Sequence, residues 1–172
     1  AGGTGHDVGA MKLQAHGITT DLPPGWEGRI TLRATPQGAA RTTGPAGTPG
    51  EIPNPVVHLA NFPLPEQRGD YGSGAVDVMT DTDVLVVLFE FGPESAGTAL
   101  FRRRGVPTRL TPNMFSPNAL QRAIPGQAGC QVFFTEAGRA FCCYTVLGRQ
   151  AAAARVLPGA NATLAATRIA PR

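Results

Sequence analysis

Lysine is nearly missing from this 172-residue chain: Lys12 stands against 14 arginines among its 15 basic residues. This bias is typical of a GC-rich genome, so we expect a high-GC bacterial source. The formal net charge of +3 permits weak attraction to anions, but the arginines are scattered. The one run, Arg102 to Arg104, has no interleaved aromatic side chains that would stack on bases. This pattern argues against nucleic acid as a partner and favours a solvated strand end or turn.

Long apolar runs are missing too. The longest, Val84 to Phe89, is far shorter than the roughly 20 residues of a membrane-spanning helix, so we expect a soluble protein without a transmembrane segment. Residues 1–10 lack the basic start and apolar middle of a signal peptide. We interpret them as a tag remnant or N-terminal extension, with Met11 as the native start and the cytoplasm as the location. If Ala1 is instead a signal-cleavage site, the protein is exported.

Cysteine is scarce, and its spacing offers no metal site. The three residues, Cys130, Cys142 and Cys143, form no CxxC pair. Neighbouring strand residues point to opposite faces, so Cys142 and Cys143 should not bridge each other. Pairing across a hairpin places Cys130 opposite Thr145, which argues against a disulfide there. We expect three buried thiols that pack as small apolar side chains.

Motifs of catalysis are absent as well. The chain has no P-loop, no dinucleotide fingerprint after a strand and no GxSxG serine. His16 and His58 are predicted on different strands, which gives no metal pair. Asp77, Asp81 and Asp83 crowd one turn without the order of an EF-hand, and we interpret them as caps and solvated turn residues. The sequence therefore predicts no catalytic residue, no metal site and no cofactor.

What the chain does contain is a strong hairpin between Cys130 and Gly148. Apolar residues flank Glu136 to Arg139 on both sides, and Gly138 can adopt the positive φ that closes the turn with a small bulge. Both arms are apolar at nearly every position. We therefore expect these strands to be buried on two faces.

The remaining pattern predicts short elements. Besides the hairpin arms, we expect strands at Lys12–Thr20, Glu27–Arg33, Val56–Phe62, Val84–Phe91 and Ala99–Arg104, and helices at Gly72–Met79, Asn118–Ala123 and Arg149–Ile169. Pro158-Gly159 should divide the last helix or start a second one. Residues 34–55 are rich in Pro and Gly and predict a loop without core residues. Residues 11–172 thus predict a single α+β domain with an antiparallel β-sheet and helices packed on one face.

Glu90 is the one acidic residue inside an apolar strand. A buried carboxylate needs a partner, and we favour an arginine such as Arg102 or Arg139, with the pair fixing strand register. Perturbed buried charges also gather at functional sites. Glu90, Arg102 and Arg139 are therefore the candidate ligand-binding residues.

Four segments carry a family resemblance, which runs from Met11 to the end. They are LPPGWEGRI (Leu22–Ile30), VLVVLFEF, GRAFCCYTVLG and LAATRI (Leu164–Ile169). With them the chain resembles the PsbP-like superfamily, which includes the LpqN-type lipoproteins of actinobacteria. The resemblance implies a Pro-Gly-Trp turn after the first strand and a last helix that covers an antiparallel sheet. It also implies an accessory or binding role without catalytic residues. The chain lacks the lipobox cysteine of LpqN.

Three functions compete on this sequence. The leading hypothesis is a non-enzymatic accessory or protein-interaction module that binds a protein partner through its sheet face, an edge strand or the Pro/Gly-rich loop. The alternatives are a small-ligand carrier with a pocket between sheet and helix and, third, a small enzyme that uses Glu90. An enclosed pocket at Glu90 would favour the alternatives, and a filled core would favour the interaction module.

Overall fold

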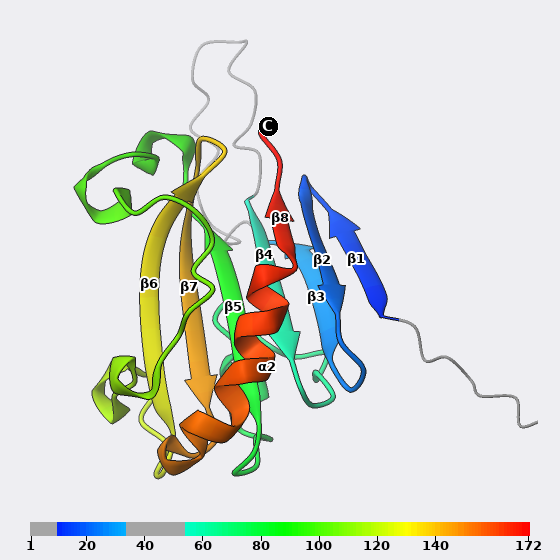
Figure 1. Cartoon of the computed structure of the whole chain (residues 1–172), viewed down its shortest axis with the longest axis vertical. Coiled ribbons are helices and arrows are strands. Elements are labelled where there is room, and N and C mark those ends of the chain that lie inside the picture. Colours follow the sequence, from blue (N-terminus) through cyan, green and yellow to red (C-terminus); the bar gives the residue numbers. More distant parts are fainter. Residues whose placement is uncertain (1–9, 34–53) are drawn as a thin grey trace, which may run out of the picture.

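The computed structural model describes residues 10–33 and 54–172 (Figure 1). Its strands are β1 (Met11–Ala15), β2 (Ile18–Leu22), β3 (Glu27–Leu32), β4 (Pro55–Ala60), β5 (Val84–Glu90), β6 (Ala128–Glu136), β7 (Arg139–Leu147) and β8 (Thr167–Ile169). The α-helices are α1 (Ser73–Val76) and α2 (Ala153–Ala165), and the 3-10 turns are η1 (Pro93–Ser95), η2 (Ala99–Phe101), η3 (Pro112–Met114), η4 (Pro117–Ala119) and η5 (Gln150–Ala152). The predicted α+β class with antiparallel pairing is confirmed, and the strands form two sheets.

Two predicted segments fall largely outside this description. The N-terminal extension is described only at its last residue, Ala10, and the Pro/Gly-rich loop only at Asn54 and Pro55. Pro55 is buried and begins β4, so the loop ends before it.

The larger sheet has the strand order β3-β4-β5-β7-β6. Every residue of β4, β5 and β7 is buried. A strand that is buried on both faces shows a continuous apolar run in place of alternation, which is why these segments were recognisable in the sequence. The predicted central strand at Val84–Phe91 is confirmed as β5.

The hairpin of β6 and β7 closes through a two-residue loop. Glu136 pairs with Arg139, and the loop residues Ala137 and Gly138 have φ values of 52° and 74°. Two left-handed residues match the right-handed twist of the strands. The predicted register is confirmed, with Cys130 opposite Thr145. The predicted bulge is wrong because the ladder stays paired up to the turn. The expected burial on two faces is confirmed for β7 and is wrong for β6, which is partly exposed because it is an edge strand.

The expected strand at Lys12–Thr20 is wrong. The chain reverses at His16 and Gly17, whose φ values are 51° and 76°, so that Ala15 pairs with Ile18 in a β1–β2 hairpin. His-Gly is not among the dipeptides that commonly mark such a turn. β2 and β3 belong to different sheets, so the turn that precedes Trp26 joins the two sheets.

The smaller sheet, β1-β2-β8, packs across β3 and β4 at Gly28. A Cβ atom on Gly28 would lie 2.8 Å from Leu13 Cδ2 and 3.0 Å from Leu59 Cδ2. Glycine therefore allows the two sheets to approach closely at this point.

Helix α2 and the smaller sheet cover one face of the larger sheet (Figure 1). Ile18 and Leu22 of β2 and Val156, Leu157, Ala160 and Leu164 of α2 share one cluster with Val57, Leu59, Val86, Leu88 and Phe141. The other face holds Val56, Leu85, Val87, Phe89 and Tyr144 under Phe62, Ala75 and Val76 of the connecting segments. The large sheet is therefore the middle layer, with α2 on one face as predicted and the short α1 on the other.

Helix α2 continues through Pro158, so the predicted division of this helix is wrong. Ala154 and Pro158 both lie on the exposed face, where water can satisfy the Ala154 carbonyl that the proline leaves without a donor. The end of the predicted helix is a strand, since Thr167–Ile169 pairs with β2. Within the described ranges, no helix has the length and apolarity that crossing a bilayer requires.

Two further element predictions are wrong. Ala99–Arg104 is no edge strand: it contains η2, and a single bridge then joins Arg104 to Thr135. Near Asn118–Ala123 the chain makes only the turn η4, because Ser116 pairs with Gly129 and holds the segment against β6. Ser116 caps this turn, since the Asn118 N–H donates to Ser116 Oγ at 3.1 Å.

Gly159→Ala should stabilise the fold. A Cβ atom at this position meets Trp26 at 3.5 Å, an ordinary contact, and alanine is the better helix former by about 1 kcal/mol. We expect the free energy of unfolding in urea to rise by up to that amount. The matched control is Gly138→Ala, which should lower it by about 1–2 kcal/mol because φ is positive there. A loss of stability in Gly159→Ala would contradict the packing of Trp26 on α2.

Candidate functional site

Glu90 lies at the end of β5, with only 2% of its surface exposed. It is opposite Phe141 in the β5–β7 ladder, which places Arg139, two residues away, on the same face. Arg139 Nε donates to Glu90 Oε1 at 2.9 Å, and Arg139 Nη2 donates to Oε2 at 2.8 Å. This bidentate pair joins β5 and β7, two of the three fully buried strands, at one end of the sheet.

The segment after β8 completes this cluster. Arg172 Nη2 lies 3.1 Å from Glu90 Oε1 and donates to Asn54 Oδ1 at 2.7 Å. Arg139 Nη1 donates to the carbonyl oxygen of Ala170 at 3.0 Å. Gly17 lies directly against it, because a Cβ atom there would be 2.8 Å from Arg139 Nη1. The cluster therefore ties both sheets and the segment after β8 together.

Of the three predicted site residues, the structure brings Glu90 and Arg139 together. Arg102 directly follows η2 in the sequence, is exposed, and makes no ion pair within the described part of the chain. Both oxygens of Glu90 and all three nitrogens of Arg139 are already hydrogen-bonded inside the protein. A ligand at Glu90 would have to displace these bonds, so the geometry is that of a structural pair.

The thiols offer no nucleophile. The three cysteines are buried and unbridged, as predicted. Burial raises the pKa of Cys142 and of Cys143 to about 12, so both thiols are protonated at neutral pH.

The acidic turn is also structural. Asp77 pairs with Arg122, Asp81 pairs with Arg149, and Asp83 Oδ2 accepts the Thr80 N–H at 2.7 Å. In residues 10–33 and 54–172, no three His, Cys, Asp or Glu side chains are grouped so as to hold a metal ion.

His58 is a buried histidine in the middle of β4. It is 2% exposed, and neither ring nitrogen makes a hydrogen bond in the described structure. Burial and the nearby charge of Arg68 lower the pKa of His58 from 6.5 to about 4, against a weaker opposite effect from the backbone of Gly69 and Asp70. The ring is therefore neutral at physiological pH and behaves as a core side chain.

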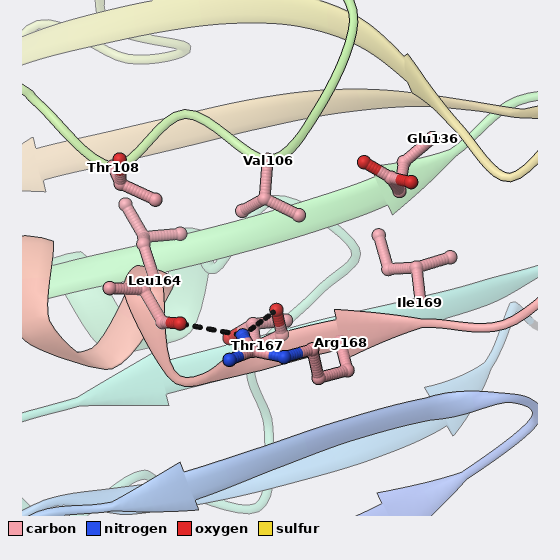
Figure 2. Close-up of a pocket in the computed structure, with 8 residues that line it drawn as sticks. Val106, Thr108, Glu136, Leu164, Thr167, Arg168 and Ile169 are labelled. Atoms are coloured by element: carbon pink, nitrogen blue, oxygen red, sulfur yellow. Dashed lines mark hydrogen bonds between the residues drawn. The ribbon is translucent and has the colours of Figure 1, made fainter.

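A groove runs along the free edge of β8 (Figure 2). Residues 105–109 form one wall, and β8 with the end of α2 forms the other. The lining residues are Val106, Thr108, Glu136, Leu164, Ala165, Thr167, Arg168 and Ile169, around a volume of about 270 Å³ that is open to solvent. This groove could not be predicted from the sequence, because residues 105–109 were assigned to no element and Thr167–Ile169 was predicted as part of a helix.

Charge and apolar surface are separated within this groove. Figure 2 shows Val106, Leu164 and Ile169 pointing into the space between the walls, with the Glu136 carboxylate at one end. No cation of the described residues lies within ion-pair distance of Glu136. The Arg168 guanidinium donates to the carbonyls of Ala165 and Thr167, at 2.7 and 3.2 Å. The groove thus has an unpaired carboxylate beside an apolar surface.

Comparison of the chain with protein-family models, curated proteins and solved structures finds no significant match. The resemblance to the PsbP-like superfamily stays a prediction.

Glu90→Gln should destabilise the protein by about 3–5 kcal/mol, because it leaves the charge of Arg139 buried without a counter-ion. Replacing both partners, Glu90→Leu with Arg139→Met, should recover most of the loss. Urea denaturation at pH 7 measures both. Asp81→Asn is the matched control: it breaks an exposed pair and should cost less than about 1 kcal/mol. Equal costs for Glu90→Gln and Asp81→Asn would rule out the structural role.

Stability should fall in mild acid because of His58. The unfolded chain binds a proton near pH 6.5 and the folded protein only near pH 4, so stability present above pH 6.5 is lost as the pH falls between these values. The loss should reach about 3 kcal/mol. In His58→Leu the slope of unfolding free energy against pH should be smaller by about one bound proton across this window. If the slope of unfolding free energy against pH is the same in His58→Leu as in the wild type, His58 is not held neutral by burial.

Proposed function

We propose that the chain is a non-enzymatic protein-interaction module that binds a segment of a partner protein at an open edge of its sheets. The observation that carries this proposal is the filled interior beside an unoccupied strand edge. Both faces of the large sheet are packed with buried apolar side chains. Among residues 10–33 and 54–172, strand β8 pairs in contrast with β2 alone and has a groove along its other side. An open edge is a template for an incoming strand.

The carrier alternative has less support. The space between the large sheet and α2 is occupied by side chains that are almost wholly buried, such as Leu88, Ala160 and Leu164. Among the described residues, Arg139 lines two open grooves, of about 290 and 240 Å³. Small-molecule pockets usually have volumes of about 300–1,000 Å³ and enclose most of the ligand.

The enzyme alternative has less support still. The charged neighbours of Glu90 are two guanidinium groups, which offer neither a nucleophile nor a general base. Its carboxylate is fully engaged in the pair with Arg139. The family resemblance, which implies an accessory role, agrees with the interaction module.

Selection from a random peptide display library against the immobilised folded chain tests the proposal. We expect enrichment of peptides that bind the folded protein and not the urea-unfolded protein. A parallel thermal-shift screen with small metabolites tests the alternative that the chain is a small-ligand carrier. Failure to enrich any peptide, together with a saturable shift of Tm by one metabolite, would replace the interaction module with the carrier.

A further inference from the structure

The outer edge of β8 has unused hydrogen-bonding groups. The Ala170 N–H donates to the Gly17 carbonyl at 2.8 Å, and Thr19 is opposite Arg168 in the same ladder. Hydrogen-bonded pairs alternate along an antiparallel ladder, so the backbone groups of Arg168 face β2. The backbone groups of Thr167 and Ile169 then face the groove. The Thr167 carbonyl already accepts a hydrogen bond from the Arg168 guanidinium at 3.2 Å, so the Thr167 N–H and both backbone groups of Ile169 remain for a partner. This edge can accept one more strand.

The opposite wall of the groove is held at both ends. The Gly105 N–H donates to the Thr135 carbonyl at 3.0 Å. At the other end, Asn161 of α2 accepts the Leu110 N–H at 2.9 Å and donates to the Leu110 carbonyl at 3.0 Å. The wall between these anchors is fixed to β6 and to α2. The groove is therefore formed before a partner arrives, which lowers the entropic cost of binding.

We propose that this groove binds an extended peptide segment that adds a strand to β8 and places a lysine or arginine against Glu136. The inference rests on the proposed function and names its site and the chemistry of its partner. Alternate residues of a strand point to one side, so the basic residue should be two positions from an aliphatic residue. The aliphatic side chain contacts Val106 and Ile169, which are partly exposed, and the cation pairs with the unpaired carboxylate. Backbone bonds to Ile169 and to the Thr167 N–H supply the remaining affinity.

A labelled heptapeptide, Thr-Val-Thr-Lys-Thr-Val-Thr, is a suitable probe, with a matched peptide that has Glu in place of Lys. Fluorescence anisotropy should show that the wild-type chain binds the Lys peptide at least about fivefold more tightly than the Glu peptide, the range of a single ion pair. Glu136→Lys should reverse this preference. Glu66→Lys, which makes the same charge change at an exposed residue outside the groove lining, should keep it.

NMR locates the peptide independently of any variant. Titration with the Lys peptide should shift the amide signals of residues 105–109, 136 and 167–169 and should slow hydrogen exchange at Ile169. A peptide that is N-methylated at the alternate residues whose N–H groups face β8 should lose most of its affinity. Binding whose shifts map to β1 or β3 would overturn the groove and leave the interaction module standing.

Two other results distinguish failure of the groove proposal from failure of the proposed function. If the display library yields peptides that bind wild type and Glu136→Lys equally, the groove is wrong and the proposed function stands. If neither the library nor the probe binds, both proposals fail. A dimer in sedimentation analysis that Glu136→Lys dissociates would identify a second copy of this chain as the occupant, and it would overturn the peptide proposal.

Discussion

The position of one sheet on the other depends on the buried ion pair between Glu90 and Arg139. Two charges in an interior are costly unless their oxygens and nitrogens are hydrogen-bonded. That requirement is met by bonds from Arg139 to Glu90 and to Ala170, and by the second cation of Arg172. These groups come from β5, from β7 and from the segment after β8. The glycine at position 17 leaves the guanidinium room, and the β1–β2 turn therefore packs directly on it.

One side of β8 is fixed by its contacts with β2 and α2, and the other side borders the groove. The ion pair and the packing at Gly28 hold the smaller sheet on the large one. A threonine cluster ties β2 and β8 to α2: the Thr167 hydroxyl lies 3.0 Å from that of Thr20 and 2.9 Å from the Thr163 carbonyl. On its other side, β8 has no strand neighbour in the part of the chain that the structure describes. A binding edge on a rigid support can distinguish partners by register and by charge, since the scaffold does not adjust to a poor match.

The sequence predicts the layers that are buried on two faces and misses the elements that long-range contacts decide. The continuous apolar runs of β5 and β7 make those strands recognisable, and the Glu136–Arg139 turn fixes their hairpin register. Glu90 stood out because a carboxylate inside such a run needs a cation, and Arg139 was one of two arginines considered for it. Nothing local marks His16-Gly17 as a turn, or Thr167–Ile169 as a strand. The first depends on packing against Arg139, and the second depends on pairing with β2. The groove could not be predicted either, because long-range contacts bring its walls together.

The pairing of β2 with β8 has a consequence for how the protein is made. The hydrogen bond between Thr20 and Thr167 spans 147 residues, so during translation β2 leaves the ribosome long before its partner exists. Until then the apolar side of β2 has no complete sheet to join, and contacts of such long separation form slowly. A ribosome-bound chain that stops short of β8 would therefore expose the β1–β2 hairpin to chaperones. Pairing of β8 with β2 would be the step that completes the smaller sheet and buries the apolar side of the hairpin.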